Sequence, residues 1–159
     1  MDVKFWKDEG AFKLRVCGII KKDNKYLISN CDNCSFWSYP GGHVTLGETT
    51  QNAVLREVYE ETQIECSITK LLATVELFFE RDDGKPFHEI GFYYLLSPTN
   101  NLPLSNFSIE ENDNGKIRQH QFKWVEMEEL ETIDVRPSDL KSALKNNHER
   151  QHIIHIEKK

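Results

Sequence analysis

The 159-residue sequence lacks the features that mark membrane, secreted or nucleic-acid-coating proteins. Its longest apolar runs, such as residues 92–96 (FYYLL), are too short to span a bilayer. The N-terminal stretch MDVKFWKDEGAFK is charged and has no apolar segment typical of a signal peptide. Basic charge is not in excess, because 20 Lys and Arg stand against 26 Asp and Glu for a net charge of −6. We therefore expect a cytoplasmic protein that binds neither membranes nor nucleic acid in bulk.

Internal repeats, low-complexity segments and a linker between domains are also missing from the sequence. What is present suits one folded unit: hydrophobic residues make up 38%, and 9 Phe, 5 Tyr and 3 Trp argue against disorder. A chain of this length can bury a core without disulfides or structural metals. We expect a single domain over residues 1–159.

The order of predicted elements indicates an α/β mixture. We expect strands over 12–20, 26–28, 68–81, 88–96 and 121–125, and a central helix over about 50–62. Residues 100–115 predict a polar loop, and a short helix begins at Met127. A last helix takes Pro137 in its first turn and Leu140 and Leu144 on its apolar face.

Cysteines and histidines form only incomplete metal-binding patterns. Cys31 and Cys34 make one CxxC in a polar loop, and no second pair stands out, so we expect free thiols. His148, His152 and His155 fit one helical stripe, although the segment also alternates like a strand. We expect an exposed terminal segment there, not a metal site.

Three carboxylates at helical spacing are the strongest chemical signal. Glu57, Glu60 and Glu61 fall at i, i+3 and i+4, so the central helix presents them on one face while Val54 and Val58 occupy an apolar arc. Like charges at this spacing weaken a helix, and a bound cation would remove that penalty. Thr49 is the expected N-cap. A solvated acidic face is the alternative for such a triplet taken alone.

The surrounding residues decide between the two interpretations. Gly42, five residues, Glu48, seven residues, Arg56-Glu57-Val58, one residue, Glu60-Glu61, one residue and Ile64 together resemble the Nudix box. One position departs from the family pattern: Gln63 stands where a glycine is usual. A glycine past a helix end supplies the left-handed conformation. Gln63 therefore predicts a penalty on the order of 1 kcal/mol, or a cap moved by one residue.

The resemblance implies a Nudix-type α-β-α sandwich with a mixed sheet, and a MutT/Nudix hydrolase similar to small bacterial ADP-ribose pyrophosphatases. It extends to residues 36–42 and to 122–130. It implies Mg²⁺ or Mn²⁺ bound by Glu57, Glu60 and Glu61, with Glu57 also acting as a base. It further implies catalytic roles for Arg56 and Glu48. Gly41 and Gly42 would bring backbone close to metal or phosphate.

A further acid or base from outside the box is left open. The candidates are Glu89, Glu110, Glu111 and His120, each of which also suits an ordinary strand or loop position. Several aromatic residues could stack on a nucleobase, although aromatic residues on strands more often belong to a core. These are Trp37, Tyr39, Phe78, Phe79 and Phe87.

The implied reaction is metal-dependent hydrolysis of a phosphoanhydride in a nucleoside diphosphate derivative. ADP-ribose, a nucleotide sugar and a damaged nucleoside triphosphate remain open as substrates, because residues 79–82 match no substrate signature of the family. A non-catalytic nucleotide-sensing domain is the alternative, and an RNA-end hydrolase is a third. The oligomeric state, including a homodimer, stays open.

Overall fold

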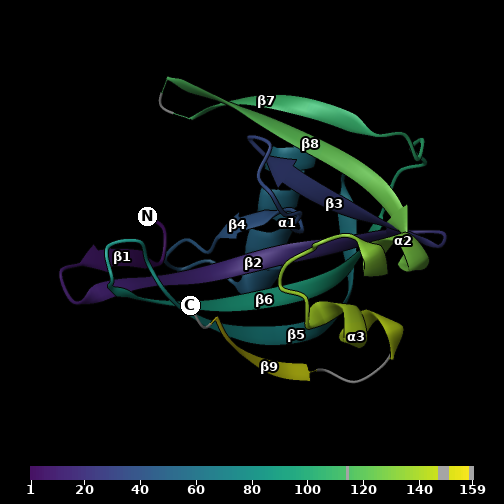
Figure 1. The fold of residues 1–159 in the computed structure, drawn as a ribbon. Helices are drawn as coiled ribbons and strands as arrows, with labels where there is room; N and C mark the ends of the chain where they lie inside the picture. Colours follow the sequence, from purple (N-terminus) through teal and green to yellow (C-terminus); the bar gives the residue numbers. More distant parts are fainter. Residues whose placement is uncertain (114, 147–150, 158–159) are drawn as a thin grey trace.

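A computed structural model describes residues 1–113, 115–146 and 151–157, and its strands form one mixed sheet packed between helices (Figure 1). The sheet order is β7-β8-β3-β2-β6-β5-β9, and β1 and β4 both pair with β2. The strands are β1 (Lys4–Lys7), β2 (Gly10–Lys22), β3 (Lys25–Cys31), β4 (Gly41–His43), β5 (Cys66–Glu80), β6 (Pro86–Pro98), β7 (Phe107–Asp113), β8 (Lys116–Glu126) and β9 (Gln151–Ile156). The helices are α1 (Thr50–Thr62), α2 (Met127–Thr132) and α3 (Leu140–Lys145).

The centre of the sheet follows from the long apolar strands. β2 and β6 run parallel from the pair Ala11–Phe87 to the pair Ile20–Leu96. β5 and β6 form an antiparallel hairpin, whose turn contains Gly84 at φ 76°. The strands predicted at 12–20, 26–28, 68–81 and 88–96 are thus confirmed, with longer bounds.

The sheet opens beside β2, and Gly41 and Gly42 of β4 lie in this opening. β3 pairs with β2 only at Lys21 and Lys22, and from there β3 runs antiparallel to β8. β4 takes the vacated edge and pairs with residues 15–17 of β2. Gly41 and Gly42 therefore lie against β2, next to the helix that follows them.

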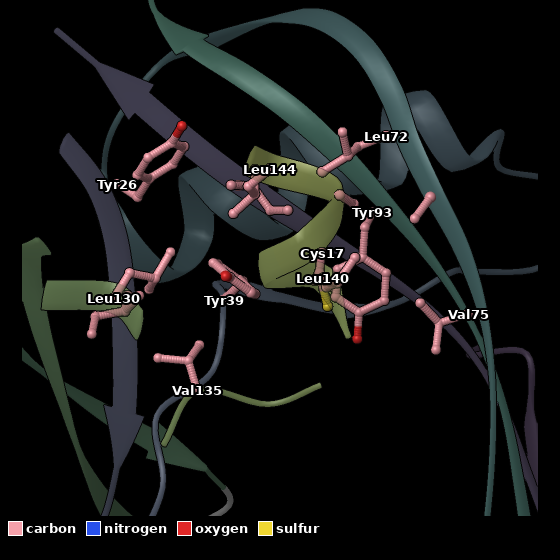
Figure 2. Close-up of a cluster of buried hydrophobic side chains, with 14 of the residues drawn as sticks. Cys17, Tyr26, Tyr39, Leu72, Val75, Tyr93, Leu130, Val135, Leu140 and Leu144 are labelled. Carbon is pink, nitrogen blue, oxygen red and sulfur yellow. The ribbon is translucent and has the colours of Figure 1, made fainter. Parts of the chain in front are cut away.

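Alternate residues of β2 serve two cores, one on each face. Val16 and Ile20 belong to the cluster that includes Val54 and Val58 of α1. On the other face, Cys17 and Ile19 belong to a cluster with residues of α2 and α3 (Figure 2). Because side chains alternate along a strand, one strand can support helices on both sides. The α-β-α arrangement predicted by the family resemblance is confirmed.

The segment 100–115 contains a strand, so the prediction of a polar loop there was wrong. β7 pairs along β8, and the ring of Phe107 stacks on Phe122 with centroids 4.7 Å apart. Charged and polar residues alternate with Phe107 and Ile109, and one buried face is enough to fix a strand. β8 also begins earlier than predicted, at Lys116.

The C-terminal part differs from expectation in two places. α3 begins at Leu140, so Pro137 precedes the helix and does not form its first turn. Residues 151–156 form β9, parallel to β5, in place of the expected exposed terminal segment. The alternating burial of β9 explains why this segment is a strand: Ile153 packs against the core while Ile154 faces outward. His152 and His155 lie on β9, and His148 falls outside the described residues.

The four cysteines are free thiols, as expected. Cys31 ends β3, and Cys34 lies in the turn that follows. Across the described ranges, no helix has the length and apolar character needed to cross a membrane.

Candidate active site

α1 positions the box carboxylates, and its bounds are those predicted. Thr49 caps the N-terminus by accepting a hydrogen bond from the Asn52 amide at 3.2 Å. Ala53, Val54, Val58 and Thr62 bury one side of the helix against the sheet. The opposite arc, which carries Glu57, Glu60 and Glu61, is left for the site.

Gln63 ends the helix without moving the cap. Its backbone adopts the left-handed conformation at φ 59°, where a glycine would be unstrained. Its amide nitrogen Nε2 donates to the carbonyls of Tyr59 and Glu60 at 3.1 and 3.3 Å. These bonds satisfy carbonyls of the last turn and offset part of the strain.

Arg56 is the centre of a hydrogen-bond network that connects three of the acids. Its Nε and Nη2 each donate to Glu48 at 2.9 Å, in a bidentate pair. Its Nη1 donates to Glu57 at 2.7 Å and to Glu60 at 3.2 Å. Nη2 also reaches the His43 carbonyl at 3.1 Å. The guanidinium is thereby fixed between β4 and α1.

Both carboxylate oxygens of Glu48 accept hydrogen bonds within this network. Besides Arg56, it accepts hydrogen bonds from the backbone amide and hydroxyl of Thr45 at 3.1 and 2.8 Å. The bonds from Arg56 lower the pKa of Glu48 to about 2, and those same bonds raise the pKa of Arg56. Glu48 is therefore a charged anchor for Arg56.

Glu57 and Glu61 approach the glycine backbone closely. The Gly41 amide donates to Glu61 Oε2 at 3.0 Å. A Cβ atom on Gly42 would lie only 2.1 Å from Glu57 Oε2, so a side chain there would displace the Glu57 carboxylate. Gly41 has φ 157°, and its Cβ would lie 2.1 Å from the Val16 carbonyl oxygen. Gly41 is therefore required by its contact with backbone, and Gly42 leaves room for the Glu57 carboxylate.

Burial makes these two carboxylates unusual. It raises the pKa of Glu61 to about 7, with the neighbouring charge of Glu57 adding to the effect. Burial also raises the pKa of Glu57, against the opposing pull of Arg56. Carboxyls that resist ionisation in the apoprotein are suited to a divalent cation, which stabilises their charged forms.

The carboxylates of Glu57, Glu60 and Glu61 are suited to a hard cation, but their side chains must move before all three can bind one ion. In the described part of the chain, no three His, Cys, Asp or Glu side chains form a ready metal-binding group. Glu60 points to Arg56, and its side chain is 57% exposed. Glu61 Oε1 makes no hydrogen bond to a described residue, which leaves it for another ligand. Carboxylate oxygens are the ligands that Mg²⁺ and Mn²⁺ prefer.

The candidates outside the box separate into three environments. Glu111 on β7 pairs with His120 Nε2 at 3.0 Å, and its charge contributes to the raised pKa of Glu61. Glu110, its neighbour on the strand, bonds to Gln119 instead. Glu89 on β6 is 7% exposed and lines a cavity. The structure thus brings Glu111 and His120 toward the box and keeps Glu110 apart.

This cavity of about 740 Å³ lies on the sheet face opposite α1. The predicted aromatics Tyr39, Phe79 and Phe87 line it, whereas Phe78 stacks on His88 across the sheet. Trp37 packs against the core. Sequence reasoning missed four cations of the lining, namely Lys13, Arg15, Arg81 and Arg136. Lys13 and Arg15 did carry a signal, because charged residues inside a predicted buried strand call for a partner.

Arg15 connects the cavity to the box. Its Nη2 lies 3.5 Å from the carbonyl oxygen of Gly41, the residue whose amide binds Glu61. The cavity therefore begins beside the buried carboxylates. A ligand that spans both places would meet acids and backbone amides at one end and aromatic rings and cations at the other.

Comparisons with known proteins agree with this geometry. Residues 13–145 match the family model of the NUDIX domain. An ADP-ribose pyrophosphatase of Methanocaldococcus jannaschii is 37% identical over 84 residues, which cover 51% of this chain and 48% of that relative. The matched region thus spans about half of that relative's length. An RNA pyrophosphohydrolase of Bartonella clarridgeiae is 31% identical over 116 residues, covering 67% of this chain and 66% of that protein.

Solved structures share the fold. The crystal structure of a NUDIX hydrolase from Nitrosomonas europaea superposes with a TM-score of 0.63 at 15% identity, covering 91% of this chain and 79% of that one. The family match extends over most of the chain and includes the complete segment of Gly42 to Ile64. The chain belongs to the Nudix hydrolase family.

Proposed function

We propose that this protein hydrolyses the phosphoanhydride bond of a nucleoside diphosphate derivative, with Mg²⁺ or Mn²⁺ held by Glu57, Glu60 and Glu61. The observation that carries the proposal is the placement of two partly buried carboxylates, Glu57 and Glu61, against the Gly41-Gly42 backbone. Buried carboxylates without a cation are unfavourable. A divalent ion supplies the missing charge, and when bound it polarises phosphoryl oxygens and activates water.

Arg56 and Glu48 act as positioning residues in this account. Arg56 Nη1 bonds to both Glu57 and Glu60, so it sets the orientation of two proposed ligands. Glu48 holds the guanidinium in the required plane through the bidentate pair. Residues of this kind commonly change metal affinity or activity by about ten- to a hundred-fold when replaced.

Two carboxylates are candidates to accept the proton of the attacking water. Glu57 lies inside the box, with one oxygen on Arg56 and the other facing Gly42. Glu111 lies on β7, hydrogen-bonded to His120, and interacts electrostatically with Glu61. Replacing each one separately assigns the base, because loss of the base lowers kcat by about a hundred-fold or more.

The adjoining cavity supports a nucleoside as the second part of the substrate. Its aromatic rings suit stacking on a base, and its cations suit phosphates. The two relatives named above act on ADP-ribose and on RNA according to their names, which supports a nucleotide substrate here. ADP-ribose, a nucleotide sugar and a damaged nucleoside triphosphate form the test set.

The test is a hydrolysis assay of the purified protein on that set, with Mg²⁺ or Mn²⁺ and with EDTA. We expect metal-dependent release of a nucleotide product and its loss in Glu57→Gln. Glu128→Gln, which changes an exposed glutamate on α2, is the matched control. No turnover by the folded wild-type protein would contradict the proposal. Calorimetric binding without product would then favour the nucleotide-sensing alternative.

A further inference from the structure

The floor of the cavity contains polar groups that lack partners. Tyr39 is 2% exposed, and its hydroxyl is buried without a hydrogen bond. Arg15 Nε is likewise buried and unpartnered. Glu89 is 7% exposed and makes neither a hydrogen bond nor an ion pair with the described residues. All three side chains line the same space.

The Tyr39 hydroxyl and Arg15 Nε call for an explanation, because buried polar atoms are normally satisfied. An unpaired buried group weakens the fold unless something else bonds to it. Lys13 lies opposite Glu89 in the β2–β6 pairing, and both Lys13 and Arg15 interact electrostatically with Glu89. These longer-range attractions stabilise the negative charge of Glu89. They are not hydrogen bonds, so the carboxylate oxygens can still accept hydrogen bonds from a ligand.

The position of Glu89 fits the far part of a nucleotide. Arg15, beside the box, pairs with Gly91, and Lys13 pairs with Glu89 two residues away. Two residues along a strand span about 7 Å. A diphosphate at the box would therefore place its attached nucleoside near Glu89.

The walls around this floor favour a flat ring. Phe79 and Phe87 stack with centroids 4.3 Å apart. The Arg81 guanidinium lies 4.7 Å above the ring of Trp6, and the Arg136 guanidinium lies 4.5 Å above that of Phe36. Aromatic rings and planar cations can stack on a base.

We infer that Glu89 is a specificity-determining residue that accepts hydrogen bonds from two adjacent donors on the nucleoside of the substrate. A carboxylate accepts and does not donate, and its two oxygens suit paired donors. Two sources supply such a pair: the N1–H and 2-amino group of guanine, and the vicinal hydroxyls of ribose. The unpartnered Tyr39 hydroxyl would form a hydrogen bond to the same ligand. This inference rests on the proposed function for its substrate class, although its test uses binding alone.

The test is isothermal titration calorimetry with GMP, IMP, AMP and 2′-deoxy-AMP in the presence of Mg²⁺. IMP lacks the 2-amino group of GMP, and 2′-deoxy-AMP lacks one of the two ribose hydroxyls. We expect wild-type protein to prefer the complete member of at least one pair by about ten-fold, the effect of one lost buried hydrogen bond. The GMP/IMP pair identifies a guanine edge, and the AMP pair identifies the ribose.

The variants connect this preference to Glu89. Glu89→Gln keeps the shape of the side chain and should reduce the preference to within about two-fold. Tyr39→Phe removes the unpartnered hydroxyl and should weaken binding of the preferred nucleotide. Glu128→Gln should match wild type. Thermal melting of each variant checks the fold, and Tyr39→Phe keeps the test valid if Glu89→Gln does not fold.

The outcomes separate this inference from the proposed function. A preference that survives in Glu89→Gln, equal binding within both pairs, or no binding of any of the four nucleotides would overturn the inference. Metal-dependent hydrolysis would still support the proposed function in those cases. A Glu89-dependent preference without any hydrolysis would keep the inference and reject the proposed reaction.

Discussion

The two sides of the site are built in different ways. On the α1 side, Gly41, Gly42, Glu48, Arg56 and the three helix glutamates come from one continuous stretch, residues 41–61. On the opposite side, the cavity takes residues from β1, β2, β5, β6, β9 and the connections between β3 and β4 and between α2 and α3. The residues proposed for the reaction are therefore close together in the sequence, whereas the residues proposed to select the substrate come together only when the chain folds. We therefore expect substitutions on the first side to lower turnover of every substrate, and those on the second to change which substrate is used.

The largest effect is expected from Glu61→Gln. Glu61 is partly buried and bonded to Gly41, and we propose that it binds the metal. Its replacement should lower kcat by about a thousand-fold for all substrates, within the range of catalytic acid–base and metal-site losses. Steady-state kinetics at saturating Mg²⁺ measures this, with Glu128→Gln as control. Retention of more than about a tenth of wild-type kcat would remove Glu61 from the metal site.

The same variant should change how stability depends on pH in the metal-free protein. Burial raises the pKa of Glu61 from 4.5 to about 7, so the folded state holds a proton that the unfolded state has lost. Wild-type stability in EDTA should therefore fall as pH rises from about 4.5 to 7, by on the order of 3 kcal/mol.

Denaturant unfolding at several pH values measures this slope. Glu61→Gln has no titrating group at this position, so its curve should be flatter than that of wild type across the same window. Parallel curves for the two proteins would show that Glu61 does not titrate as its buried position predicts.

Arg56→Lys should have a smaller effect on the same side of the site. Lysine keeps the positive charge but does not reproduce the bidentate pair with Glu48 or the simultaneous bonds to Glu57 and Glu60. We expect kcat to fall by about ten- to a hundred-fold. Arg118→Lys, at a half-exposed arginine of β8 that pairs with Asp32, should leave kcat unchanged. Equal losses in both variants would argue against a specific role for Arg56.

Elements and site residues could be predicted from the sequence where the residues that determine them are neighbours in the chain. α1 was predicted with its observed bounds, since Thr49, the apolar spacing of Val54 and Val58, and the terminal Gln63 all act within a few residues. β7 was not predicted because its sequence is mostly polar, and it forms a strand only through its pairing with β8. The cavity was missed for the same reason, since parallel pairing of β2 with β6 is needed to bring Lys13 and Arg15 beside Glu89.

The smallest effect is expected from Gln63→Gly, which restores the usual residue of the box. Glycine relieves the left-handed strain but loses the two side-chain bonds to the last turn. The free energy of unfolding should rise by no more than about 1 kcal/mol. Because the Gln63 side chain bonds only to the backbone carbonyls of Tyr59 and Glu60 and to no carboxylate, kcat should stay the same. A large change in kcat would show that the helix end is coupled to the metal site.

The most direct test of the central claim is Mn²⁺ titration of the apoprotein by calorimetry, with Glu61→Gln and Glu89→Gln measured side by side. Both glutamates interact electrostatically with Arg15, but Glu89 lines the cavity and only Glu61 lies on the α1 side. The two-sided account predicts that Glu61→Gln weakens Mn²⁺ binding by about ten-fold or more, and that Glu89→Gln binds Mn²⁺ like wild type. Weakened binding in Glu89→Gln together with unchanged binding in Glu61→Gln would contradict it.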